Sequence, residues 1–525
     1  TLSRHVDMTI EYPTIIDHLS PPKSDDAFEA DLVAMSEIIR QKLDIRRSFM
    51  PEGSPSPGWI WYDRSEQGAE FRPWWMAFQG AKGCTPWGPD SLGVRQGAKS
   101  MAFWAFVHPQ LAHTRSSAWL ASGIEDLTRG VGKIFVDYQR AGDPVAVLYS
   151  QPSMHLAWAW SDVESAFYPD PTSLYAWYYR SRVNTTRLLR ELGFTYRYVG
   201  TSEIEAGNLD KYRVLFLPCS LCLSDATMEH IRRFVEAGGL VVADLGAGAA
   251  DGRGKPIAHR ESVEQLFGIS RDAVCRTMKP DTLEVVGKPR IESLAGLKLA
   301  GADAITSRAE VAVAHADKTP AVVVNPVGKG KAVYLNGFLG YNMMSRQLIR
   351  AMLASASVES PVRVTSGGNE RMGYEATTFR RGNVEILGVL RLCEEQGPTE
   401  VHIGRKAHLY DVRGGRYFGL TDTATFDLTQ KAAAVLAILP YQIGGVSLKA
   451  SPEEVERGET VSLDADLLIL RLSSDLAPQM EERGALPQAG DHVLRIEVFD
   501  PAGRLSRAYT ANVLATSGER RYRLQ

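Results

Sequence analysis

The feature that most constrains the fold is an alternation of short apolar runs with helical segments across residues 143–360. Residues 145–149, 214–217 and 240–243 read Val-Ala-Val-Leu-Tyr, Val-Leu-Phe-Leu and Leu-Val-Val-Ala. Such continuous apolar runs are typical of strands buried on both faces of a parallel sheet. Ser224 is well suited to cap a helix that Gly238 would end. The pattern predicts an open, doubly wound α/β domain over 143–360.

Further strands and helices are expected within this domain, and others are expected before it. Strands are expected near residues 196–199, 321–325 and 331–336, and helices through 175–189 and 345–354. Ahead of residue 143, three strand–helix units are expected, with strands at 6–10, 46–50 and 83–87 and helices at 24–39, 73–79 and 122–139. Three such units in succession favour a parallel sheet or part of a barrel, because a closed barrel needs eight.

Helical patterns almost vanish after Pro361. Alternating segments such as 384–390 and 407–412 are separated by glycine turns, which is typical of a β-sandwich over 361–443. Residues 467–472 and 492–499 continue the pattern, and we expect an Ig-like β-sandwich over 444–525. The predicted fold class is therefore α/β plus β, with residues 1–142 forming the first domain.

Composition excludes several classes of function. The 525 residues carry 59 basic and 62 acidic side chains, a formal charge of -3, which provides no field for nucleic acid or an anionic membrane. No window approaches the roughly 20 apolar residues of a membrane-spanning helix. The five cysteines are scattered, so thiols are the expected state, and no ligand set for a metal or cofactor is visible.

One stretch carries the chemistry that we expect. Glu52 follows the short run 46–50 and precedes a proline-rich loop, Trp59 and then Arg72-Pro73-Trp74-Trp75. A carboxylate among indole rings and an arginine is a common arrangement in sites that cleave sugars. Glu52 would then lie at the carboxyl end of a strand, where barrel enzymes place their catalytic groups.

Each of these residues also has a structural reading. Glu52 could be a solvated loop acid, and Trp59, Trp74 and Trp87 could be core residues, since indoles serve both packing and sugar stacking. Arg72 could hold Glu52 ionised or be an exposed cation at a helix start. Glu11, followed by Tyr12, could contact a sugar hydroxyl or form a salt bridge.

The order of partial barrel, amidotransferase-like α/β domain and β-sandwiches resembles glycoside hydrolase family 42 β-galactosidases. The local matches are Glu52 with its proline-rich loop, Arg72-Pro73-Trp74-Trp75 and Gln79-Gly80-Ala81, where Gln79 replaces the family's usual histidine. The segment around Leu217-Pro218 and 223–239 resembles the family's trimerisation domain. Residues 437–441 resemble a boundary of its β-domains.

The resemblance implies a retaining glycosidase that hydrolyses a terminal β-linked sugar through a glycosyl-enzyme intermediate. Glu52 matches the nucleophile at the end of barrel strand seven, so residues 1–142 would hold strands six to eight. Glu11, Tyr12, Trp59, Arg72, Trp74 and Trp87 would bind substrate. A retaining site needs two carboxyl groups about 5 to 5.5 Å apart. Only the nucleophile can be assigned in this chain, so the acid/base carboxyl would lie on the earlier strands of the barrel, outside it.

The resemblance also implies partners. We expect a homotrimer, a glycoside or oligosaccharide substrate, and the N-terminal half of the barrel from the same precursor or another chain. The alternative is a non-catalytic carbohydrate-binding or assembly subunit. Amidotransferase chemistry at Cys219 or Cys222 is not expected, because their flanks lack the small residues of a nucleophile elbow. The sequence leaves the compartment open, cytoplasmic or exported.

Overall fold

The computed structural model divides the chain into two compact units. Unit 1 comprises the described residues within 14–52 and 142–361, and unit 2 those within 53–141 and 362–525. The structure describes residues 40–41, 43–50, 57–60, 66–86, 113–142, 144–161, 173–257, 259–271, 282–284, 297–314, 318–392, 397–428, 432–456, 458–472, 489–517 and 519–524.

Unit 1 is built on a seven-stranded sheet. Its order is β12-β13-β14-β7-β6-β4-β5, with β14, β7, β6, β4 and β5 parallel and β12 and β13 antiparallel. The strands are β4 Val145–Leu148, β5 Tyr196–Val199, β6 Val214–Leu217, β7 Leu240–Ala243, β12 Glu310–Ala314, β13 Pro320–Val327 and β14 Gly330–Leu335. The apolar runs predicted to be buried strands are β4, β6 and β7, and all their residues are buried.

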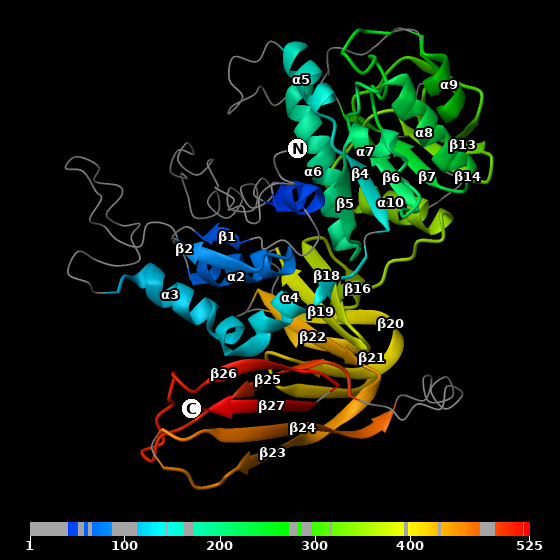
Figure 1. Cartoon of the computed structure of the whole chain (residues 1–525). Helices are drawn as coiled ribbons and strands as arrows, with labels where there is room; N and C mark the ends of the chain where they lie inside the picture. Colours follow the sequence, from blue (N-terminus) through cyan, green and yellow to red (C-terminus); the bar gives the residue numbers. More distant parts are fainter. Residues whose placement is uncertain are drawn as a thin grey trace, which may run out of the picture. The chain divides into compact units, whose positions relative to one another are not determined.

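Helices lie on both faces of this sheet (Figure 1). They are α5 Gln151–Ala159, α6 Leu174–Glu191, α7 Thr201–Glu205, α8 Asp225–Glu236, α9 Glu261–Phe267 and α10 Met343–Ser355. Ser224 caps α8 as predicted, because its Oγ accepts the Thr227 N–H at 2.9 Å. None of the described helices is long and apolar enough to cross a membrane. An α/β domain with a mostly parallel sheet is therefore confirmed for this part of the chain.

Short strands extend unit 1 beyond the main sheet. They form one three-stranded sheet in the order β15-β10-β9 and one pair, β11-β8. Their bounds are β8 Ile269–Arg271, β9 Thr282–Glu284, β10 Lys298–Ala300, β11 Ile305–Ser307 and β15 Phe338–Leu339.

Residues 40–41 and 43–49 are helical, so the strand predicted at 46–50 is wrong. Polar side chains on this helix point to the α/β domain: the Gln41 amide donates to Thr186 at 2.8 Å, and Ser48 Oγ accepts the Tyr198 N–H at 2.9 Å. The Asp44 carboxylate accepts from the Tyr196 hydroxyl. A short apolar run fits either a strand or a buried helix turn, and here polar contacts at helical spacing decided for the helix.

Unit 2 begins with a parallel βαβ unit. Strand β1 Pro57–Ile60 pairs in parallel with β2 Gly83–Pro86, with Trp59 opposite Thr85, and helix α2 Glu66–Phe78 joins them. The strand predicted at 83–87 is confirmed as β2. The helix predicted from Pro73 is part of α2, which begins earlier, at Glu66.

The single helix predicted at 122–139 is wrong. The chain instead forms α3 Arg115–Gly123, a π-helical segment η4 Leu127–Val131, α4 Gly132–Asp137 and a short strand, β3 Gln139–Arg140. Gly130 has a φ of 132°, which breaks the helix because only glycine adopts it readily. Thr114 caps α3, with its side chain accepting the Ser117 N–H.

The main sheet of unit 2 has eight strands. Its order is β17-β16-β20-β22-β19-β18-β3, and β21 pairs with β20. The strands that follow residue 361 are β16 Arg363–Ser366, β17 Asn369–Glu370, β18 Tyr374–Arg381, β19 Val384–Arg391, β20 Pro398–Asp411, β21 Arg416–Asp427 and β22 Ala433–Leu439. Because β3 pairs with β18, the segment before residue 142 contributes a strand to this sheet.

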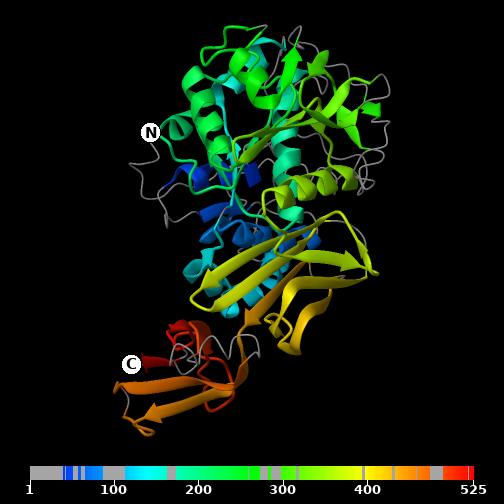
Figure 2. The same ribbon diagram turned by 90° about the vertical axis from the view of Figure 1, so that its right-hand side faces the viewer.

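The two faces of this sheet are covered differently. One face curves around a core that includes Tyr374, Leu387 and Leu436, seen as the curved yellow strands in Figure 2. On the other face, Phe379 lies 5.0 Å from Phe135 of α4 between ring centroids. The β20 strand bends at a register shift between His402 and Ala407, which lets one sheet enclose its own core.

Residues 441–524 form two small sheets. One has the order β23-β24-β27, and the other pairs β25 with β26. The strands are β23 Tyr441–Ser451, β24 Val461–Leu472, β25 His492–Ile496, β26 Ala511–Ala515 and β27 Glu519–Leu524. Leu463, Ile496 and Val513 form the core between them. The predicted strands at 467–472 and 492–499 correspond to β24 and β25.

Candidate functional site

The predicted site residues are only partly covered by the structure. Glu11, Tyr12, Glu52 and Trp87 lie outside the described residues. Trp59 belongs to β1, where only its backbone is described. Arg72 and Trp74 lie in α2. The βαβ unit of β1, α2 and β2 is therefore the part of the candidate site that the structure builds.

The carboxyl ends of β1 and β2, at Ile60 and Pro86, mark the face where a barrel would carry out chemistry. The first turns of α2 lie next in the chain after β1, so they begin on that side. The strand expected to end at Glu52 is helical, and β1 begins only at Pro57. In chain order Glu52 therefore precedes β1, whereas the acids Asp63 and Glu66 follow it.

Trp74 is a core residue in this structure, which favours the packing alternative over a contact with substrate. Its side chain is 0% exposed, and the guanidinium of Arg413 lies 4.0 Å from the ring centroid. Its Nε1–H donates to the Gly123 carbonyl at 3.1 Å, and Phe78 and Phe135 contact it edge-on. Stacking against a sugar needs an exposed ring face, and here the Arg413 guanidinium covers one face of the Trp74 ring. Arg413 is so far along the chain that the sequence around Trp74 gives no sign of this contact.

Arg72 keeps a place among the candidates. It is half-buried and lies at the middle of α2, six residues after Glu66 and six before Phe78. Gln79, which stands where the resembled family has histidine, follows the carboxyl end of α2 and is 4% exposed.

A second arrangement lies at the carboxyl edge of the sheet in unit 1. Cys219 follows β6 and has a φ of 42°, an uncommon conformation for a residue with a side chain. Its N–H donates to Asp244 Oδ1 at 2.6 Å, and the Ser181 hydroxyl donates to Asp244 Oδ2. The backbone therefore has a strained turn at a strand end, as a nucleophile elbow has.

The chemistry of an elbow is nevertheless missing at Cys219. The thiol is fully buried, and burial with the nearby Asp244 carboxylate raises its pKa well above the usual value. A nucleophilic cysteine needs a lowered pKa and a partner base. No histidine hydrogen bond to Cys219 occurs within the described residues.

A buried arginine with three tyrosines lies at the same carboxyl edge of the sheet in unit 1, and the sequence did not predict it. The Arg182 guanidinium lies over the rings of Tyr149, Tyr178 and Tyr179 at 5.1–5.2 Å and donates through Nε to Gln41. Arg182 is 3% exposed, so these contacts satisfy a buried cation. Tyrosines at helical spacing in α6 were the only sequence signal, and that spacing alone does not reveal a guanidinium among them.

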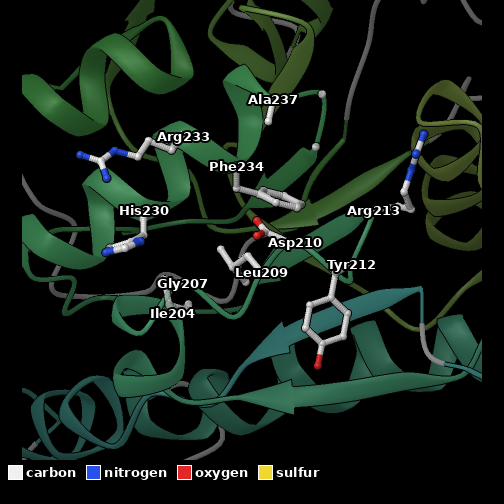
Figure 3. A pocket seen from close by; sticks show the side chains of 12 residues that line it. Ile204, Gly207, Leu209, Asp210, Tyr212, Arg213, His230, Arg233, Phe234 and Ala237 are labelled. Carbon is white, nitrogen blue, oxygen red and sulfur yellow. The ribbon is translucent and has the colours of Figure 1, made fainter.

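A hollow of about 600 Å³ opens at the amino ends of β6 and β7. Its lining includes buried Leu209 and Phe234 together with the polar residues His230, Arg233 and Arg213. Figure 3 shows His230 and Arg233 at one end of the hollow and Arg213 at the other, with Asp210 between them. Ligand pockets use polar groups that converge on one point, and these diverge.

Within the described residues, no group of three or more His, Cys, Asp or Glu side chains is arranged to hold a metal ion. Cys84, Cys219 and Cys222 are free thiols. The pair Cys219 and Cys222 therefore has metal-like spacing in the sequence without a matching set of ligands in this part of the structure.

A family model matches the α/β domain of unit 1. Residues 144–359 match the family model described as the β-galactosidase trimerisation domain. These bounds nearly coincide with the doubly wound domain predicted at 143–360. No curated protein sequence matches the chain.

Solved structures extend the likeness to most of the chain. A catalytic mutant of a GH42 β-galactosidase from G. stearothermophilus is 17% identical with a TM-score of 0.60, covering 78% of this chain and 57% of that one. The β-galactosidase from Rahnella sp. R3 is 16% identical with a TM-score of 0.59, covering 77% and 57%. The enzyme from Bacillus circulans sp. alkalophilus is 15% identical with a TM-score of 0.55, covering 79% and 68%.

These likenesses support an α/β plus β fold shared with those enzymes, and this chain spans 57% of the length of the first of them. The resemblance of the segment 223–239 to the family's trimerisation domain is thereby confirmed. Residues 144–359 belong to the β-galactosidase trimerisation-domain family, and the chain carries the fold of the glycoside hydrolase family 42 β-galactosidases.

Proposed function

We propose that the chain is the C-terminal part of a retaining glycoside hydrolase of β-galactosidase type. It would hydrolyse a terminal β-linked sugar together with barrel strands supplied by another segment. The observation that carries the proposal is the trimerisation domain at 144–359 in a chain whose fold follows GH42 β-galactosidases over 78% of its length. The parallel unit of β1, α2 and β2 is what the last part of a βα barrel requires.

The reaction needs two carboxyl groups with different roles. One attacks the anomeric carbon to form a glycosyl-enzyme ester, while the other protonates the leaving oxygen and then activates water. Glu52 is the proposed nucleophile because of its sequence context of a proline-rich loop and Trp59. Glu66 is the competing candidate, because it follows β1 at the carboxyl end and opens α2. The acid/base carboxyl is proposed to come from the segment that completes the barrel.

A trapping experiment distinguishes the two glutamates. The complete assembly would be incubated with a 2-deoxy-2-fluoro-β-galactoside, which forms a slowly hydrolysed ester with the nucleophile, and digested for mass spectrometry. A mass increase on the peptide that contains Glu52, lost in Glu52→Gln, supports the proposal. A label on Glu66 would move the nucleophile to α2 and leave the retaining mechanism in place.

The wider proposal has its own test. Hydrolysis of an aryl β-galactoside by the complete assembly, with the first product in the β configuration by NMR, supports a retaining β-galactosidase. Failure to hydrolyse aryl β-galactosides, β-fucosides and α-arabinosides, despite measurable sugar binding, would instead identify a non-catalytic subunit.

The assembly is proposed to be a homotrimer, because residues 144–359 belong to a trimerisation-domain family. The chain has a mass of 57.8 kDa, so light scattering of the chain alone would give about three times that value. A monomer at micromolar concentration would contradict the proposal.

A further inference from the structure

The buried side chain of Arg413 connects the sheet of unit 2 with α2. It lies in the turn between β20 and β21, and its side chain is 6% exposed. Its guanidinium forms ion pairs with Glu70 at 3.1 Å and Asp126 at 2.8 Å. The same group donates to the Ala433 carbonyl at 2.6 Å and covers one face of Trp74.

On α2 these contacts fall at Glu70, in the first half of the helix, and at Trp74, just past its middle. Glu70 also accepts the Ala432 N–H at 2.8 Å, so both of its oxygens are bound by the sheet side. Gly123, at the end of α3, lies so close that a Cβ there would be 2.7 Å from the Glu70 Cα. Glu70 is thus held between the end of α3 and Arg413.

These contacts lie on the same helix as Arg72, so they bear on the candidate substrate site. The helix begins after the carboxyl end of β1, which is the side of a βα unit that carries catalytic groups. Arg72, a candidate for substrate binding, lies between Glu70 and Trp74 in the sequence. A shift of α2 would therefore move Arg72 with it, and small displacements of groups that hold a substrate lower rates strongly.

We propose that Arg413 is a positioning residue, through which the β-sheet of unit 2 fixes the position of α2. The sheet then serves as the platform of the barrel's last βαβ unit and not only as an appended domain. Only the kinetic part of this inference rests on the proposed glycosidase function. The structural part concerns the order of α2 and can be measured in any case.

Hydrogen–deuterium exchange of the full chain measures that order directly. Loss of one partner of a buried ion pair leaves a buried charge, so Arg413→Ala should raise exchange in residues 66–74 by about a hundredfold. Exchange in residues 144–359 should not change. Arg413→Lys should give an intermediate increase, because an ammonium cannot bind two carboxylates and cover an indole in the same way.

Arg416→Ala is the matched control. Arg416 lies beyond the same turn and is exposed, and its guanidinium lies 4.8 Å from the centroid of the Phe418 ring. It should leave exchange in α2 unchanged. If Arg413→Ala does not accumulate, Glu70→Gln removes one ion pair with little change of shape and should raise exchange in the same residues.

The outcomes separate this inference from the proposed function. Unchanged exchange in residues 66–74, or an equal increase across both units, would overturn the positioning role. In a complete assembly that hydrolyses glycosides, Arg413→Ala should lower kcat at least tenfold with KM within about threefold, since orientation is lost and not binding. An inactive wild-type assembly would count against the glycosidase proposal while the exchange result still decides the role of Arg413.

Discussion

The Asp244 carboxylate accepts the backbone N–H of Cys219 at 2.6 Å and so fixes a turn in which Cys219 has a positive φ of 42°. A left-handed residue with a Cβ is strained, and a buried carboxyl that binds its N–H offsets part of that strain. The pair thus stabilises the turn at the end of β6. The same carboxyl also makes the stability of unit 1 depend on pH.

Asp244→Asn should remove a pH dependence from the unfolding of unit 1. Burial raises the pKa of Asp244 to about 7, against hydrogen bonds from Ser181 and Cys219 that lower it. Between the unfolded pKa of about 4 and the folded value, the folded state holds a proton that the unfolded chain releases. The free energy of unfolding therefore falls as pH rises through this window, by up to about 1.4 kcal/mol per pH unit.

Urea unfolding of the variant and the wild type at about pH 5 and about pH 7.5 measures this slope. Asp251→Asn is the control: hydrogen bonds from the Lys255 and Arg253 N–H groups lower the pKa of Asp251, so any slope it contributes has the opposite sign. A wild-type slope that persists in Asp244→Asn would show that another group carries it.

His492 should give unit 2 the opposite pH dependence. Burial lowers the pKa of His492 to about 4, while the neighbouring Asp491 raises it. Its Nε2 is 2.6 Å from the Tyr441 hydroxyl. Below the unfolded pKa of about 6.5 the unfolded chain binds a proton that the folded state refuses, so stability is lost as pH falls from about 6.5 toward 4.

His492→Gln should flatten this loss, which near-UV circular dichroism during acid unfolding would follow. His155, on α5 of unit 1 and exposed, provides the control variant His155→Gln, which should leave the acid limb unchanged. An acid midpoint that is the same in His492→Gln and the wild type would contradict the assignment.

Gly388→Ala should destabilise unit 2 by about 1–3 kcal/mol, because added volume in a packed interface forces shifts. A Cβ at Gly388 of β19 would lie 2.5 Å from the Phe78 ring of α2. Gly83→Ala is the control, since its Cβ would meet nothing within 4 Å. Thermal unfolding of both variants measures the difference. Phe78→Leu should cost less in the Gly388→Ala background than alone, as expected for residues in contact.

Trp74→Phe should lower stability without weakening substrate binding. The change removes the hydrogen bond to the Gly123 carbonyl and part of the surface that Arg413 covers, a loss of about 2 kcal/mol. KM for an aryl glycoside in the complete assembly should stay within about twofold of the wild type. A large rise of KM with unchanged unfolding would restore Trp74 as a sugar-binding residue.

The sequence predicted unit 1 well because its signals are local. Strands such as 214–217 are continuously apolar, and α8 has both a capping serine and a terminal glycine, so each element follows from a few neighbouring residues. The same reasoning failed at 46–50 and at 122–139. There the outcome depended on contacts with residues far along the chain, such as Ser48 with Tyr198, and on the conformation of Gly130.

The amino-acid sequence by itself determined the α/β domain, the change to β structure after Pro361 and the likeness to the family. Only the tertiary structure decided that the segment 53–141 belongs to the same compact unit as residues 362–525. It also decided that Trp74 is core, because Arg413 lies more than three hundred positions away in the chain yet covers its ring. Periodicity reports which side chains are buried, whereas the partner that buries them is fixed by the packing of distant elements.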